Sequence, residues 1–100
     1  MSGGASIYIL RCADNSYYTG ITKRPLEERF GEHVNGALPG CYTFSRRPVV
    51  LVYSEHHELI AEAVATERRI KGWSRAKKEA YIRGDFDRLV QLAKRRGGNG

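Results

Sequence analysis

The chain has 100 residues, 41% of them hydrophobic, which suits one globular domain built around one core. Lys and Arg outnumber Asp and Glu by 17 to 11, and the resulting net charge of +6 favours a polyanionic partner such as DNA or RNA. The apolar runs are far shorter than the roughly 20 residues of a membrane span. No charged-then-apolar leader opens the sequence, so we expect a cytoplasmic protein, neither membrane-bound nor secreted.

The first elements are predicted to form a hairpin. Residues 6–12 (SIYILRC) and 17–22 (YYTGIT) are rich in β-branched and aromatic residues, and residues 13–16 (ADNS) have turn chemistry. Residues 1–5 are expected to be a flexible N-terminus.

A helix is predicted next. Pro25 suits a first helical turn, and the acidic Glu27 and Glu28 suit the positive end of the helix dipole. Asn35-Gly36 suits the end of this helix, and residues 36–47, rich in Gly and Pro, are predicted to be a loop.

A third strand follows the loop. Residues 48–54 (PVVLVYS) are almost continuously apolar, which favours a strand that is central or well covered. His56-His57 is interpreted as the turn from this strand into a helix.

Cys12 and Cys41 form no CxxC pair and have no His at zinc-site spacing, so we interpret them as free thiols of a reducing compartment.

Three helices complete the predicted fold. They cover about residues 58–73, a short segment from Ser74 to Gly84, and residues 86–96, with Ser74 and Asp85 as N-caps.

The expected fold class is α/β (α+β), in one domain over residues 6–96 followed by a flexible tail over residues 97–100. The domain is expected to have a small three-stranded antiparallel sheet flanked by helices. The order is strand, strand, helix, strand, helix, helix, helix.

The first predicted helix places two polar side chains beside its core-facing stripe. Leu26, Phe30 and Val34 follow one another at a spacing of four and form this stripe. Arg29 and His33 are also four apart and share one flank of it, so they point along the seam between helix and sheet. The alternative interpretation is purely structural: Arg29 extends its charged end toward solvent, and His33 is a core residue with satisfied hydrogen bonds.

The second predicted helix carries an acid on its buried face. This face is marked by four residues at helical spacing: Leu59, Ala63, Thr66 and Ile70. Glu67 projects into the same sector, and a lone ionised carboxylate among apolar groups is unfavourable without a cation. The cation is either Arg29, in a structural pair, or a divalent metal, and periodicity leaves both open.

Tyr8 and Tyr18 lie on the two strands of the hairpin, and the loop length decides whether they share a face. A two- or four-residue loop puts them on opposite faces, whereas an odd loop, such as residues 14–16, puts both on one face. Asn15 or Ser16 then takes the unusual turn conformation, which Asn accepts more readily. Core tyrosines are the alternative interpretation of this pair.

These motifs resemble the GIY-YIG nuclease family. Ser6-Ile7-Tyr8 stands at the first motif element of that family and Tyr18-Thr19-Gly20 at the second. Arg29 and His33 match the Arg-x-x-x-His pairing of several members, and Glu67 matches their downstream metal-binding Glu.

The sequence is most similar to the small stand-alone bacterial members like YhbQ, the UPF0213 group. The shared runs are YTGIT at residues 18–22, Arg29 to His33, and RRPV at residues 46–49. The resemblance covers about residues 6–83.

The sequence also departs from the family pattern. Ser6 replaces the first Gly of the motif, Thr19 replaces the central Ile, and no Asn matches the one that some members carry after the metal-binding Glu. The run from Gly20 to Arg29 is one residue longer than in most members. We expect the loop before the helix to absorb it and to leave Arg29 in place.

The resemblance implies a metal-dependent DNA endonuclease that leaves a 5′ phosphate and a 3′ hydroxyl. The implied preference is structure-selective or single-strand-directed, with a role in DNA repair. Glu67 is implied to hold one Mg²⁺ or Mn²⁺ ion, Arg29 to contact the phosphate, and Tyr18 to position water or phosphate. Tyr8 is implied to orient or deprotonate the attacking water, with His33 hydrogen-bonded in the same network. Both tyrosines must then lie on one face, which predicts an odd or bulged hairpin loop.

Further residues are candidates for contact with nucleic acid: Lys23, Arg24, Tyr42, Arg46, Arg47, Arg68, Lys71 and Arg75. For each basic residue the alternative is a solvated surface charge. DNA is the expected partner and RNA the alternative. Two other functions stay open: a non-catalytic nucleic-acid-binding module on the same fold, and a protein-interaction domain with a structural Arg29–Glu67 pair.

Overall fold

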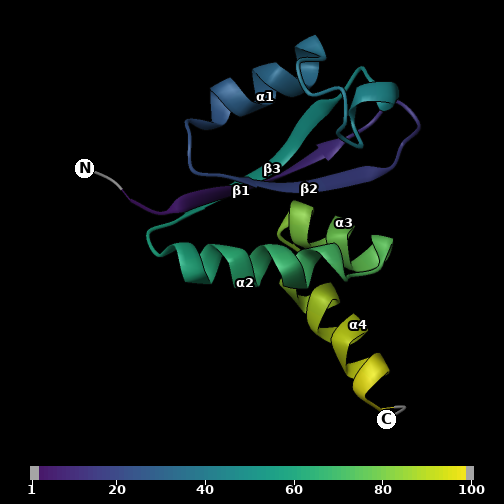
Figure 1. Ribbon diagram of the computed structural model, residues 1–100. Helices are drawn as coiled ribbons and strands as arrows, with labels where there is room; N and C mark the ends of the chain where they lie inside the picture. The colour runs from purple at the N-terminus through teal and green to yellow at the C-terminus, as the bar shows by residue number, and fades with distance from the viewer. Residues whose placement is uncertain (1–2, 99–100) are drawn as a thin grey trace.

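The computed structural model describes residues 3–98 (Figure 1). The elements in chain order are β1 (Ala5–Arg11), β2 (Tyr17–Thr22), α1 (Leu26–Asn35), the short 3-10 helix η1 (Phe44–Arg46), β3 (Val50–His57), α2 (Ile60–Lys71), α3 (Arg75–Arg83) and α4 (Phe86–Gly98). The strands form one antiparallel sheet in the order β2-β1-β3. The predicted fold class and element order are therefore confirmed.

The molecule has three layers. Figure 1 shows α1 on one face of the sheet and α2 and α3 on the other, while α4 extends away from the body. Side chains alternate along the central strand β1, so each face has its own apolar cluster. The cluster toward α2 and α3 contains Ala5, Ile7, Ile9, Ala63 and Ile70, and the cluster toward α1 contains Tyr8, Leu10, Cys12 and Val49.

The prediction that the third strand is central or well covered is wrong. β1 is the central strand, and β3 is an edge strand whose Val50 is 49% exposed. An apolar run can therefore also belong to a partly exposed strand, and it does not indicate how many strands flank it. β3 also extends further than expected, since His56 and His57 pair with Ser6 and Ala5 and do not form a turn.

The hairpin loop is odd, as predicted. Tyr8 pairs with Gly20 and Leu10 with Tyr18, which places both tyrosines on the face toward α1. The Cys12 N–H donates to the Ser16 carbonyl at 2.8 Å and closes residues 13–15 into a loop. Asn15 takes the left-handed conformation there, with φ at 71°.

The predicted helix ends are confirmed at three caps. Gly36 ends α1 in the left-handed conformation, with φ at 71°. The Ser74 hydroxyl accepts from the Lys77 N–H at the start of α3, and the Asp85 carboxylate accepts from the Arg88 N–H at the start of α4. No helix within residues 3–98 is long and apolar enough to cross a membrane.

Two residues expected in the core lie outside it. Val34 is 43% exposed because the inward stripe of α1 runs through Leu26, Phe30 and His33, and Val34 is turned away from it. Leu59 is 60% exposed because it caps α2 in an extended conformation, before the helical spacing begins.

The expected flexible ends are corrected in part. Ala5 belongs to β1 and is buried, so the ordered domain begins before residue 6, and α4 extends to Gly98. The remainder of that expectation concerns residues 1–2 and 99–100, which lie outside the described part of the chain.

Candidate active site

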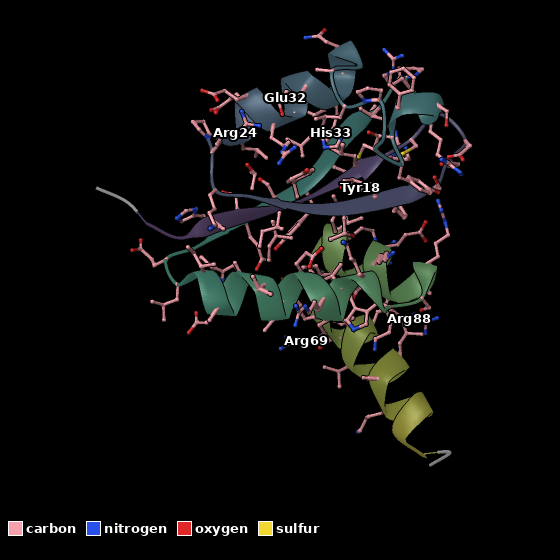
Figure 2. All side chains as sticks on the ribbon, viewed as in Figure 1. Tyr18, Arg24, Glu32, His33, Arg69 and Arg88 are labelled. Carbon is pink, nitrogen blue, oxygen red and sulfur yellow. The ribbon has the colours of Figure 1, made fainter. Side chains whose placement is uncertain are left out.

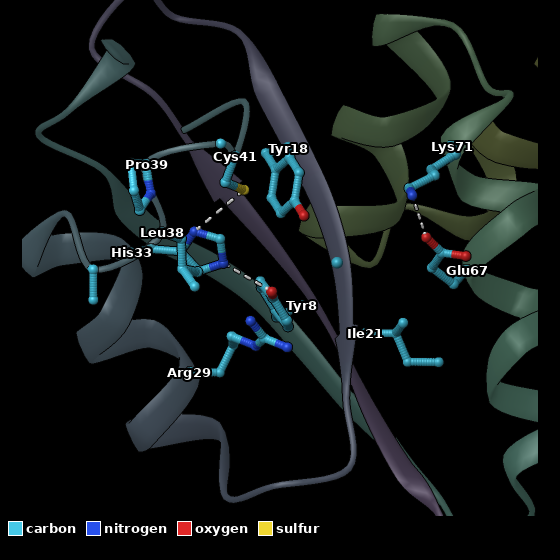
Figure 3. Close-up of a pocket in the computed structure, with 13 residues that line it drawn as sticks. Tyr8, Tyr18, Ile21, Arg29, His33, Leu38, Pro39, Cys41, Glu67 and Lys71 are labelled. Atoms are coloured by element: carbon cyan, nitrogen blue, oxygen red, sulfur yellow. Dashed lines mark hydrogen bonds and ion pairs between the residues drawn. The ribbon is translucent and has the colours of Figure 1, made fainter. Parts of the chain in front are cut away.

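A pocket of about 490 Å³ lies at the β2 edge of the sheet (Figure 3). It is lined from both faces: by α1 and the loop after it on one side, and by α2 on the other. All five implied catalytic residues line it, namely Tyr8, Tyr18, Arg29, His33 and Glu67. Arg29, on α1, lies in the lining of this pocket, whereas the placement of the extra residue in the loop before α1 stays a prediction.

Tyr8 and Gly20 depend on each other. Tyr8 is almost fully buried on the central strand, directly opposite Gly20 on β2. A Cβ atom at Gly20 would overlap the Tyr8 ring and its hydroxyl. Glycine at this position therefore leaves the space in which the Tyr8 phenol reaches the pocket.

His33 connects Tyr8 to the loop after α1. Its Nε2 atom lies 2.9 Å from the Tyr8 hydroxyl, and its Nδ1 atom lies 2.7 Å from the Thr43 hydroxyl. His33 is only 1% exposed, and burial, assisted by the nearby Arg29 charge, lowers its pKa below 6.5. The imidazole is thus neutral near neutral pH. When Nδ1 carries the proton and donates it to Thr43, Nε2 is the acceptor for the Tyr8 hydroxyl.

Both tyrosines are held in the protonated form. Burial raises the pKa of Tyr8 to about 12, although the Arg29 charge opposes this. Burial also raises the pKa of Tyr18, and its hydrogen bond with Cys41 acts in the same direction. At neutral pH each phenol is therefore a hydrogen-bond donor unless a base takes its proton.

Arg29 lines the pocket and has one hydrogen-bond donor without a partner among the described residues. Its Nη1 atom lies 3.6 Å from a Glu32 oxygen, whereas its Nε atom is buried and has no hydrogen-bond partner among the described residues. A buried donor without a partner is unfavourable and is readily satisfied by an anion.

Glu67 is buried, and its ion-pair partner is a residue that the sequence analysis did not consider. Its Oε2 atom lies 2.6 Å from Nζ of Lys71, one helical turn further along α2. Figure 3 shows Arg29 and Glu67 on opposite sides of β2, so the Arg29–Glu67 pair, one of the two alternatives that the sequence left open, is not formed. The structural alternative for Glu67 therefore involves Lys71.

A single carboxylate suits some metal ions and not others. Residues 3–98 hold no group of three or more His, Cys, Asp and Glu side chains that could enclose an ion. Mg²⁺ and similar hard cations bind through one or two carboxylates, keep several waters and add substrate phosphates as ligands. Glu67 fits such an ion, and it does not fit a closed zinc site.

The sequence matches the GIY-YIG catalytic domain over residues 4–80. The chain belongs to the GIY-YIG family. Its relatives include the UPF0213 protein SSP2268 of Staphylococcus saprophyticus, 47% identical over 76 residues that make up 76% of this chain and 90% of the relative. The UPF0213 protein of Syntrophus aciditrophicus is 40% identical over 83% of this chain and 94% of its own length. The catalytic domain indicates nuclease activity and a nucleic-acid substrate.

Two solved structures have the same fold. The UPF0213 protein BH0048 from Bacillus halodurans matches with a TM-score of 0.54 and 33% identity, over 89% of this chain and 96% of that one. The protein EF2693 from E. faecalis matches with a TM-score of 0.59 and 34% identity, over 86% and 92%. The chain is thus a UPF0213-type member of the GIY-YIG family.

Sequence reasoning missed two neighbours of His33 in this GIY-YIG site, Thr43 and Cys41. Thr43 is buried and orients the imidazole, and the Cys41 sulfur lies 4.0 Å from Nδ1. Burial alone would raise the pKa of Cys41, but hydrogen bonds from the Thr43 backbone and side chain outweigh this and lower it. Both residues lie in a loop without periodicity, so no sequence pattern relates them to α1.

Most of the residues predicted to contact nucleic acid lie outside the active-site pocket. Lys71 lines the pocket, and Lys23 and Arg24 line a hollow beside it. Figure 2 shows Arg24 near Glu32 of α1, and their ion-pair distance is 2.7 Å.

Two of the predicted basic residues contact the tip of the β1–β2 hairpin. Arg46 forms an ion pair with Asp14 and lies 3.7 Å from the centre of the Tyr42 ring. Arg75 donates to the Asn15 carbonyl at 2.6 Å.

Two further candidates also contact their own chain. The Tyr42 ring stacks on Tyr18, with centroids 6.1 Å apart, so a base could use Tyr42 only in competition with these contacts. Arg47 donates to the Phe44 carbonyl at 2.9 Å, and Arg68 is exposed on α2.

Proposed function

We propose that the protein is a metal-dependent DNA endonuclease that hydrolyses phosphodiester bonds to a 5′ phosphate and a 3′ hydroxyl. The observation that carries the proposal is the convergence of Tyr8, Tyr18, Arg29, His33 and Glu67 on one pocket from four separate elements. A nucleophile-activating pair, a cation for the phosphate and a carboxylate for a metal ion are the groups that this reaction needs.

The Tyr8–His33 hydrogen bond supports a route for the proton of the attacking water. A phenol with a pKa of about 12 is a poor base at rest. As water attacks, its proton passes to the Tyr8 oxygen while the Tyr8 proton passes to Nε2 of His33. The neutral imidazole accepts this proton, and Thr43 holds the ring in the required orientation.

Arg29 and Tyr18 act on the phosphate in this proposal. The unpartnered Nε donor of Arg29 suits a phosphate oxygen and would stabilise the charge that develops in the transition state. Tyr18 stays protonated and donates to the same phosphate or to a water.

Glu67 would hold one Mg²⁺ or Mn²⁺ ion. The bound ion would supply Lewis-acid stabilisation of the scissile phosphate and of the departing 3′ oxygen. Lys71 already neutralises the same carboxylate, so the ammonium group and the ion compete for Glu67.

The Glu67–Lys71 ion pair also favours a second candidate, a non-catalytic nucleic-acid-binding module. Such a module needs no metal, and a lysine would satisfy its buried acid permanently.

A cleavage assay on single-stranded, duplex and flapped DNA, with Mg²⁺ or Mn²⁺, tests the proposal. Wild type is compared with Glu67→Ala and with Glu62→Ala, an exposed acid of the same helix. We expect wild type and Glu62→Ala to cut and Glu67→Ala to be inactive. The preferred substrate would show whether the enzyme is structure-selective or single-strand-directed. Either preference would suit the proposed role in DNA repair. Absence of cutting by folded wild type on every substrate, RNA included, would favour the binding module.

A further inference from the structure

A second hollow, of about 360 Å³, adjoins the active-site pocket. Ile21 of β2 and Arg29 of α1 line both spaces, so the two meet at the free edge of the sheet. A strand of nucleic acid that leaves the pocket along β2 would enter this hollow next. We call it the flanking hollow.

The wall of the flanking hollow is largely apolar. It is formed by Ala5, Ile21, Ile60 and Val64. Ile60, in the first turn of α2, is 40% exposed, which leaves a large apolar side chain open to a ligand. The volume lies within the range of about 300–1,000 Å³ that is usual for small-molecule sites.

The rim of the flanking hollow carries three cationic side chains, two of which lie near carboxylates of α1. Arg24 is paired with Glu28 and Glu32, and Arg29 also faces Glu32. Lys23 has no carboxylate within ion-pair distance in the described part of the chain, so its charge is available to an anion.

The hollow continues into a third space of about 250 Å³, lined by Ser6 and His56. Lys23 and Arg24 line both spaces. The three spaces thus adjoin one another from the active site to the loop before α1, to which Lys23 belongs.

We propose that the flanking hollow binds the base of the nucleotide next to the phosphodiester being cut, while Lys23 contacts the backbone phosphate of that nucleotide. This inference rests on the proposed function. An apolar wall beside a lysine matches the two halves of a nucleotide, a flat base and an anionic backbone. Thr22 offers the base little, because its hydroxyl already accepts from the Arg24 N–H. The surface proposed to contact the base is the apolar wall, so the site accepts bases without reading their identity, and the base that enters is unpaired and unstacked.

The first test measures binding without cleavage. A labelled oligothymidylate of about ten nucleotides is titrated in EDTA into wild type, Ile60→Ala and Leu59→Ala. Leu59 is the matched control, because it precedes Ile60, is even more exposed and does not line the hollow. We expect Ile60→Ala to weaken binding about threefold to tenfold, through lost burial of apolar surface, and Leu59→Ala to leave it unchanged.

An abasic strand of the same length shows whether the base is what Ile60 contacts. On this strand, wild type and Ile60→Ala are expected to bind equally. Lys23→Met is expected to weaken binding to both strands and to reduce the salt dependence by about one phosphate contact. Equal affinity of Ile60→Ala and Leu59→Ala for oligothymidylate, or an Ile60 effect that persists on the abasic strand, would overturn the proposal.

Cleavage of the same strand with Mn²⁺ separates this inference from the proposed function. Cutting without any Ile60 effect on affinity would leave the nuclease in place and remove the flanking site. An Ile60 effect on affinity without cutting by any variant would leave a nucleotide-binding site on a non-catalytic module.

Discussion

The hydroxyl of Tyr8 lies 2.9 Å from Nε2 of His33, although the two residues belong to the central strand and to α1. Both side chains are almost completely removed from solvent. Burial shifts the two pKa values apart, raising that of the phenol and lowering that of the imidazole. The resting pair is therefore neutral: Tyr8 keeps its proton, and Nε2 of His33 carries none and accepts the hydrogen bond from Tyr8. This is the state that the proposed reaction requires.

Replacement of His33 by Gln should remove the acceptor while retaining a side chain that can bond to Thr43. We expect kcat to fall by about 10²–10⁴-fold, the usual contribution of a positioned acid or base. Wild-type activity should persist on acidification below pH 6.5 and decline through the lowered pKa of His33, since only the neutral imidazole accepts the proton. A pH profile of kcat measures this. His57→Gln, on β3 and outside the lining of the three spaces, is the control, and a profile unchanged in His33→Gln would contradict the assignment.

Replacement of Gly20 by Ala should displace Tyr8. The added methyl group overlaps the phenol ring, so the strand or the ring must move, which costs about 1–3 kcal/mol of unfolding free energy. Urea denaturation measures this loss. Gly31→Ala is the matched control, because a Cβ there meets nothing within 4 Å and alanine favours the helix by about 0.5–1 kcal/mol. Equal stability of the two variants would show that the Tyr8 ring adapts freely.

The shared face of Tyr8 and Tyr18 was predicted from the family resemblance, because the residues of the hairpin alone left both loop parities open. The parity of a hairpin loop is a counting rule, and Asn15 is the residue that accepts the turn. By contrast, Thr43 reaches His33 only because the loop after α1 folds back over the helix. That contact depends on tertiary structure and leaves no periodic signal.

Two further errors have different physical origins. The partner of Glu67 was present in the sequence at the i+4 position, but an exposed lysine at the border of a buried face gives no stronger signal than a distant arginine. The position of β3 was mistaken because an apolar run also occurs in this partly exposed strand, whereas strand order depends on which neighbours form hydrogen bonds.

Replacement of Lys71 by Met should strengthen binding of Mn²⁺ to the metal-free protein. The ammonium group competes with a cation for Oε2 of Glu67, and a pair whose lysine is about half exposed contributes modestly, so we expect about a twofold to fivefold lower Kd. Titration calorimetry or Mn²⁺ resonance measures the affinity without any cleavage. Arg69→Met removes the same charge from an exposed position of α2 (Figure 2) and controls for net charge. A Kd that falls equally in both variants would exclude specific competition at Glu67.

Replacement of Glu55 by Gln should reduce stability at neutral pH through a second polar network, on the opposite face of the sheet. The Glu55 carboxylate accepts from the Tyr53 hydroxyl at 2.6 Å and also bonds to Tyr81 and His57. Burial alone would raise the pKa of Glu55, but these hydrogen bonds outweigh it, and the folded pKa lies below 4.5. Its stabilisation is therefore fully present above pH 4.5 and is lost as the pH falls through the folded pKa.

Urea denaturation across a pH series tests this sign. Glu55→Gln should unfold more easily than wild type at neutral pH by about 1.5–3 kcal/mol, the usual contribution of hydrogen bonds to a charged group. The difference should shrink on acidification, because the wild-type carboxylate becomes protonated and then resembles the amide. Glu58→Gln, exposed just beyond β3, should show no such trend. A difference that stays constant down to strongly acidic pH would mean that the hydrogen bonds of Glu55 do not depend on its charge.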